Sequence, residues 1–321
     1  MKKILRGEKL RRFLHYIVVF CAGLLRPMRL VCSNNNSTKL TQKEQEKKKM
    51  GKERSGIREK TYYCQGTSAA PQPDYIEIDL FPFYDLKYKP CKGARRKTTT
   101  PKQKKLNDKK ARRYFRLLAK TNFGLNDIHL VLSYDDEHKP ESVEAAEKEV
   151  KNFIRRLKRR YEKKGLKLKY IYITEEGSTN GRIHHHLLIN KGVERDVIEQ
   201  VWGKGYANST RIQLEHGGID GLVCYLSKDP KGRKRYTPSQ NLTKPLESVS
   251  DTKTSRRQFQ QLTLWPEDCE SMKEHFERKH PGYRVVSVEK YYNTITCEWY
   301  IRTRMELKEE YRHKGKERRN E

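Results

Sequence analysis

The sequence carries three consecutive histidines, His184, His185 and His186, inside an otherwise apolar run at residues 182–189. The run is typical of a β-strand, whose side chains alternate between two faces. His184 and His186 are therefore expected on one face, about 6 to 7 Å apart along the strand, and His185 on the other, packed or hydrogen-bonded. Neutral imidazole is a common metal ligand, so the two histidines that share a face could hold one divalent ion.

Two carboxylates are expected beside these histidines. Residues 168–174 are rich in β-branched and aromatic side chains and predict another strand, and residues 177–181 carry a strong hairpin turn signal. The hairpin brings Glu175 and Glu176 back to the histidine strand. Only one of them can share the face of the histidine pair, and a one-residue error in the strand boundary would exchange them. The pattern predicts a metal site of two histidines and one carboxylate.

Tyr225 is a candidate nucleophile on a short helix that is predicted further along the chain. The buried stripe of this helix has helical spacing and comprises Ile219, Leu222, Val223 and Leu226. Tyr225 lies at the edge of the stripe, and Lys228 is its neighbour one turn later on the helix surface. A tyrosine there could equally be a half-buried packing residue. Paired with the histidine strand, its hydroxyl becomes a candidate for nucleophilic chemistry.

The elements that must position these residues predict an α+β fold. From about residue 105 the order is helix, strand, helix, hairpin, helix, strand, helix. This order suits an antiparallel sheet with flanking helices, in a ferredoxin-like or RRM-like layout. We expect one domain over residues 105–305, with a C-terminal strand extension from about residue 262 that includes strands at 283–288 and 294–303.

Together the motifs resemble the HUH endonucleases (histidine, bulky hydrophobic, histidine), and within them the single-tyrosine initiators of rolling-circle replication. Residues 128–134 look like the leading hydrophobic motif, and residues 184–186 look like the histidine motif, with a histidine as its middle residue. Residues 225–228 match the Tyr-x-x-Lys pattern. The tyrosine follows the histidines, as in initiators and single-tyrosine transposases, whereas conjugative relaxases carry it ahead of them.

The resemblance implies an activity and a site. Tyr225 would nick single-stranded origin DNA through a 5′-phosphotyrosyl intermediate and later allow rejoining, with Lys228 steadying the phosphate. His184 and His186 would hold Mg²⁺ or Mn²⁺, and imidazole ligands lean slightly toward Mn²⁺. Glu175 is preferred over Glu176 as the third ligand, because the family's carboxylate precedes the hairpin turn in a comparable position.

Two alternatives stay open. One is a single-tyrosine transposase of the same chemistry. The other is a non-catalytic nucleic-acid binder on an RRM-like sheet, with Tyr170 and Tyr172 stacking on bases. The sequence has no Gly-x-x-x-x-Gly-Lys-Ser/Thr motif, so unwinding would fall to a host helicase and synthesis to a host polymerase. No small-molecule cofactor is expected.

The overall charge points to a polyanionic partner. The 321 residues include 71 basic and 41 acidic side chains, which gives a formal charge of +30 and favours nucleic acid. The loop at residues 229–260 is predicted to be mobile. Its candidate contacts to the DNA backbone are Lys231, Arg233, Lys234 and Arg235.

The chain ends are predicted to lie outside the folded domain. Residues 1–104 read as a basic, largely disordered or loosely attached arm, with a short strand or docking segment at 75–81, and residues 306–321 as a charged tail. The apolar segment 13–25 resembles a signal-peptide core but is too short to span a bilayer comfortably, so its role stays open. The seven cysteines include no Cys-x-x-Cys pair and fit a reducing cytoplasm, and membrane association is not expected.

Overall fold

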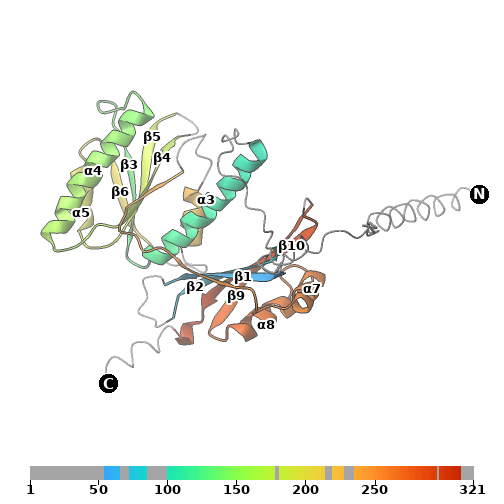
Figure 1. Ribbon diagram of the computed structural model, residues 1–321. Helices are drawn as coiled ribbons and strands as arrows, with labels where there is room; N and C mark the ends of the chain where they lie inside the picture. Colours follow the sequence, from blue (N-terminus) through green and yellow to red (C-terminus); the bar gives the residue numbers. More distant parts are fainter. Residues whose placement is uncertain are drawn as a thin grey trace, which may run out of the picture. The chain divides into compact units, whose positions relative to one another are not determined.

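The computed structural model describes residues 54–65, 72–84, 100–177, 181–213, 219–227, 235–294 and 296–311. These residues form two antiparallel five-stranded sheets with flanking helices (Figure 1), which confirms the predicted α+β class. The apolar segment 13–25, most of the predicted basic arm and most of the charged tail lie outside these ranges. Among the described residues, no helix combines the length and the apolar character needed to cross a bilayer.

The histidine sheet is the five-stranded sheet that contains the three histidines. Its strand order is β6-β3-β5-β4-β7. The strands are β3 (Ile128–Ser133), β4 (Tyr170–Glu176), β5 (Ile183–Ile189), β6 (Ala207–Arg211) and β7 (Thr237–Pro238). The leading strand and the hairpin therefore lie where the sequence predicted them. The single strand predicted between the last two helices of this order is β6, which begins at Ala207.

One face of the histidine sheet is covered by α4 (Val143–Lys163) and α5 (Arg195–Trp202) (Figure 1). The side chain of Ser142 caps α4 by accepting a hydrogen bond from the Ala145 amide, and the apolar residues recur along one side of the helix. The core beneath these helices is large and includes Leu130, Leu132, Phe153, Leu157, Tyr161 and Trp202. This packing makes the sheet a rigid support for the side chains on its other face.

The opposite face of the histidine sheet is partly covered by α3 (Pro101–Asn122) and α6 (Asp220–Leu226). Thr100 caps α3, which has a proline in its first turn, where no amide hydrogen is needed. A second core joins both helices to the sheet and contains Phe115, Leu118, Ile171, Ile173, Leu188, Ile219, Val223 and Leu226. The helix predicted around Tyr225 is thus fixed by contacts to α3 and to β4 and β5.

The second sheet is built from both ends of the chain and has the order β8-β1-β2-β10-β9. Its strands are β1 (Ser55–Cys64), β2 (Tyr75–Tyr84), β8 (Leu246–Ser250), β9 (Tyr283–Asn293) and β10 (Glu298–Leu307), and α7 (Arg256–Leu264) and α8 (Glu270–Lys279) pack on one face. Residues 54–65 and 72–84 therefore differ from the loosely attached arm that we expected. The late strands pair with them and form a sheet of their own, so they do not extend the histidine sheet.

A buried charge network joins α3 to the other face of the second sheet. The carboxylate of Glu77 on β2 is fully buried and lies 2.7 Å from Arg113 Nε and 2.9 Å from Arg116 Nη2. Burial alone raises the pKa of Glu77, but the guanidinium groups of Arg116, Arg113 and Arg302 outweigh it and hold the pKa below its ordinary value of 4.5. The carboxylate therefore stays ionised and ties α3 to the sheet.

Candidate metal centre and nucleophile

The hairpin register decides which carboxylate faces the histidines. Glu175 lies directly opposite His184 in the β4–β5 ladder, so the two side chains share a face with His186. The Glu175 Oε2 atom is 3.9 Å from Nε2 of His184 and 3.9 Å from Nε2 of His186. The three candidate donor atoms all lie within 4.8 Å of one another. A cluster of this kind could hold a single divalent ion.

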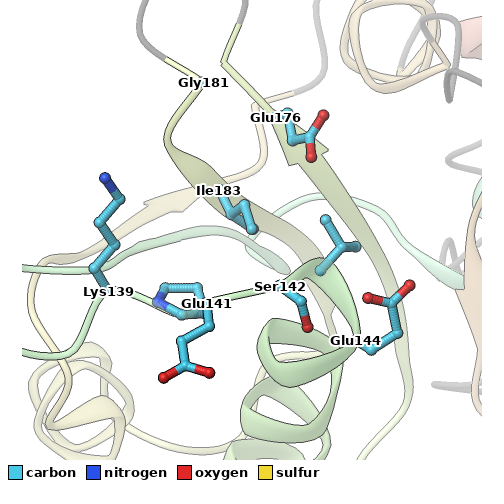
Figure 2. Close-up of a pocket in the computed structure, with 9 residues that line it drawn as sticks. Lys139, Glu141, Ser142, Glu144, Glu176, Gly181 and Ile183 are labelled. Carbon is cyan, nitrogen blue, oxygen red and sulfur yellow. The ribbon is translucent and has the colours of Figure 1, made fainter.

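Glu176 faces the other way. It pairs with Ile183 across the ladder, and both residues line a pocket at the start of α4 that also includes Ser142 and Glu144. Figure 2 shows Glu176 at this pocket together with Glu141 and Glu144. The structure thus places Glu176 away from the histidine pair. The one-residue ambiguity in the strand boundary is resolved in favour of Glu175.

The ring nitrogens that face away from the cluster are engaged by other groups. His184 Nδ1 lies 3.3 Å from the carbonyl oxygen of Arg182. His186 Nδ1 lies 3.3 Å from Nε2 of His129, a residue of β3. Both histidines therefore direct Nε2 toward Glu175, the orientation that a shared ion requires. The His, His, carboxylate donor set fits a transition metal or Mg²⁺ with open positions for a substrate.

His185 is a structural residue on the reverse face, as expected from the alternation. Its side chain is fully buried, with Nε2 2.8 Å from the Tyr134 hydroxyl and Nδ1 2.9 Å from the Thr174 hydroxyl. Burial and the nearby His184 lower the pKa of His185 to about 3, so the ring is neutral at physiological pH. Its two ring nitrogens serve the core and take no part in the cluster.

Tyr225 on α6 lies beside the cluster of Glu175, His184 and His186. Its ring centroid is 5.7 Å from that of His186, with the ring planes at 89°, and 49% of the side chain is exposed. Val223 and Leu226 are buried and fix the helix, while Tyr225 is exposed over about half of its surface. The arrangement combines a half-exposed tyrosine with the donor set for a cation. That combination is suited to nucleophilic attack on a phosphate held by the ion.

The other predicted residues are placed differently. Lys228, Lys231, Arg233 and Lys234 lie outside the described residues. Arg235 is buried, donates a hydrogen bond to the Ser227 carbonyl at 2.8 Å and forms an ion pair with Asp108 at 3.2 Å. Its guanidinium group anchors the chain after α6. The rest of the predicted mobile loop includes β7, β8 and the start of α7 among its described residues.

The two tyrosines of the non-catalytic alternative pack in or against the core beneath α4. Tyr172 is 3% exposed in the core beneath α4, and Tyr170 packs against the same core. The face that carries them is the one covered by α4 and α5. An RRM-like use of this face would require an open sheet surface, and the structure closes it.

His129 was missed in the sequence. It occupies the second position of the leading strand motif and shares the site face with Val131 and Ser133 by alternation. The sequence shows that alternation, but only the pairing of β3 with β5 brings His129 next to His186. The signal that could have identified it is a histidine in the leading strand motif, close to the strand predicted to carry the metal-binding histidines.

Comparison with known proteins connects this part of the fold with replication. Residues 127–230 match the model of the family described as replication-associated protein ORF2, a rolling-circle replication initiator family. The matched segment begins just before β3 and ends beyond Tyr225, so it contains all three residues of the cluster. No curated protein and no solved structure matches the chain. Initiators of this kind are nucleases and strand transferases in general.

Proposed function

We propose that this protein nicks and rejoins single-stranded origin DNA to initiate rolling-circle replication, with Tyr225 as the nucleophile. The observation that carries the proposal is the position of Tyr225, whose ring lies 5.7 Å from that of His186 in the Glu175, His184 and His186 cluster. The family match over residues 127–230 supports the replication role. The net charge of +30 supports a nucleic-acid substrate.

The cluster would hold the ion that the reaction needs. His184 and His186 would bind it through Nε2, and Glu175 would supply a carboxylate oxygen and offset part of the positive charge. The chemistry supplied there by Mg²⁺ or Mn²⁺ is polarisation of the scissile phosphate and stabilisation of the charge on its oxygens. The protein's own contribution is to hold the three donors on two strands whose register fixes their spacing.

Tyr225 would make the covalent bond. Its hydroxyl oxygen attacks the phosphorus, a new oxygen–phosphorus bond forms, and the bond from phosphorus to the 3′ oxygen breaks. The products are a 5′-phosphotyrosyl linkage and a free 3′-hydroxyl, which takes up the proton that the phenol releases. Because the linkage is again a phosphodiester, a later 3′-hydroxyl can displace the tyrosine by the reverse step. Nicking and joining therefore need no nucleotide cofactor.

The proposal extends to residues around the tyrosine. Lys228 comes two residues after the end of α6 in the sequence and would steady the phosphate. Lys231, Arg233 and Lys234 would contact the DNA backbone. Arg235 is left out, because its side chain is buried and bonded within the protein. Unwinding and synthesis would come from a host helicase and polymerase, since the sequence has no ATP-binding motif of the P-loop type.

The test is a nicking assay on single-stranded DNA from the protein's own replicon, with Mn²⁺. The wild-type protein should cut and remain attached to the 5′ end, and Tyr225→Phe should bind the DNA almost as tightly but not cut it. Tyr206→Phe is the matched control, because Tyr206 is 75% exposed and lies outside the cluster. Cutting by Tyr225→Phe at the wild-type rate would rule out Tyr225 as the nucleophile. A wild-type protein that binds this DNA but never cuts it would leave only a basic nucleic-acid-binding protein.

A further inference from the structure

His129 makes a directed contact with one of the two candidate metal-binding histidines. The His129 Nε2 and His186 Nδ1 atoms are 3.3 Å apart, and the ring planes are within 10° of parallel. The ring centroids are 5.5 Å apart. This distance is about the sum of the nitrogen–nitrogen distance and the distance from each nitrogen to the centre of its own ring. The two nitrogens therefore lie close to the line between the ring centres. This is the geometry of an in-plane hydrogen bond and not of face-to-face stacking.

A hydrogen bond between two neutral imidazoles can have either of two proton assignments. If His186 donates from Nδ1, its Nε2 keeps a lone pair that points toward Glu175, as a metal ligand requires. If His129 donates, the proton of His186 is on Nε2 and blocks the metal position. A neutral histidine side chain in water prefers the proton on Nε2, so an acceptor at Nδ1 favours the ligand form.

His184 shows how the neighbouring ligand meets this requirement. Its Nδ1 faces the carbonyl oxygen of Arg182, which can only accept, so the proton is on Nδ1 and Nε2 carries the lone pair. At His186 the group that faces Nδ1 is the imidazole of His129. If His129 plays the same part at His186 that the Arg182 carbonyl plays at His184, then His129 is the acceptor of the Nδ1 proton.

We propose that His129 is a positioning residue of the metal centre. Its Nε2 accepts the Nδ1 proton of His186, which fixes both the tautomer and the ring orientation of His186. The inference rests on the proposed metal-dependent function and deepens it, since His129 would act on the site through His186. Metal-binding histidines usually donate their second N–H to a carboxylate or a carbonyl group. In this protein an imidazole from the adjacent strand β3 takes that place.

The experiment compares two substitutions in the full chain. His129→Leu removes the acceptor, and His129→Gln can restore one with its amide oxygen. His280→Gln is the matched control, since His280 ends α8 on the second sheet. Mn²⁺ affinity is measured from the electron paramagnetic resonance signal of the free ion, and the tautomer of His186 from long-range ¹H–¹⁵N NMR spectra of the metal-free protein.

We expect His129→Leu to weaken Mn²⁺ binding about ten- to hundredfold and to shift the His186 proton to Nε2. His129→Gln should recover most of the affinity, and His280→Gln should bind Mn²⁺ like the wild type. The inference would be overturned if His186 of the wild-type protein carries its proton on Nε2. It would also be overturned if His129→Leu binds Mn²⁺ as tightly as the wild type, or if His129→Gln loses as much Mn²⁺ affinity as His129→Leu.

The failure of the proposed function would look different. If the wild-type protein does not bind Mn²⁺, the assignment of the cluster as a metal centre is wrong. The NMR spectra still report whether the Nδ1 proton of His186 depends on His129. Thermal unfolding of each variant, followed by circular dichroism, separates loss of the hydrogen bond from loss of the fold.

Discussion

At the histidine strand, side chains of one type have different roles because they lie on different faces. His184 and His186 meet Glu175 on the face toward α6, whereas His185 is hydrogen-bonded within the core. The alternation of a strand predicted this division from the sequence alone. The choice between Glu175 and Glu176 could not be made from the residues, because it depends on the ladder register, and the contact of His129 depends on a pairing between strands far apart in the chain.

His184→Ala should abolish metal-dependent cutting, because the cluster loses one of its two imidazoles. Binding of single-stranded DNA should stay nearly unchanged, since the substitution leaves every Lys and Arg side chain in place. The comparison is made with Mn²⁺ in the nicking assay and by fluorescence anisotropy with a labelled oligonucleotide. Nicking by His184→Ala at the wild-type rate would count against its role as a ligand.

His185→Leu should lower the free energy of unfolding by about 1–3 kcal/mol, because the hydroxyls of Tyr134 and Thr174 lose a buried partner. The Mn²⁺ affinity of the folded protein should not change. Urea denaturation measures the stability and titration with Mn²⁺ measures the affinity. A variant that keeps full stability but loses Mn²⁺ binding would contradict the structural role assigned to His185.

At the scale of elements, α6 is short and depends on its neighbours for its position. Its apolar stripe was visible in the sequence, but the surface that receives the stripe, formed by α3, β4 and β5, was not. A helix of this length is stable only through packing, because its own hydrogen bonds cannot offset the cost of nucleation. The placement of Tyr225 thus depends on core residues that do no chemistry.

Leu226→Ala tests this dependence. Leu226 is 1% exposed, and its truncation should cost about 2–5 kcal/mol of stability and slow formation of the covalent DNA adduct, with little change in DNA affinity. Leu264→Ala is the matched control, since Leu264 is 84% exposed at the end of α7. Unfolding curves and adduct time courses are the measurements. Equal effects of the two substitutions would mean that packing of α6 does not position the tyrosine.

The buried Glu77 makes the attachment of α3 to the second sheet sensitive to acid. Because the folded state lowers the pKa of Glu77 below 4.5, its stabilisation is complete above that pH and is lost as the pH falls through the lowered pKa. Glu77→Gln should cost about 3–5 kcal/mol at neutral pH and should flatten the acid limb of the stability curve.

The matched control for Glu77 is Glu247→Gln, which removes an exposed partner of Lys60 and should cost at most about 1 kcal/mol. Denaturant unfolding from pH 3 to pH 7 provides the curves for both variants and the wild type. An unchanged acid limb in Glu77→Gln would show that another group controls the pH dependence.

At the scale of the whole molecule, the second sheet was the part of the fold that could not be predicted from the sequence. Its strands β1 and β2 pair with β8 and β10, which lie far along the chain, and no local pattern specifies such partners. The polar and lysine-rich composition of residues 33–110 as a whole also suggested a loose arm. The alternation at residues 75–81 was the one visible signal, and the structure confirms a strand there as part of β2.

Because the chain has a formal charge of +30, binding to single-stranded DNA should weaken steeply with salt. Each phosphate contact adds about 0.7 to the negative slope of log affinity against log salt concentration. Anisotropy titrations with Tyr225→Phe between low and physiological salt measure this slope without cleavage. A slope near zero would exclude the electrostatic contacts that the proposal assigns to the basic side chains.

The central claim is that Tyr225 attacks a phosphate held at the histidine cluster. Its most direct test is to trap the protein on single-stranded origin DNA with Mn²⁺, digest the complex and identify the nucleotide-bearing peptide by mass spectrometry. We predict that the nucleotide is on Tyr225 and that the adduct is absent without Mn²⁺. A nucleotide on another residue, such as Tyr206, or DNA cut without any covalent adduct, would contradict the claim.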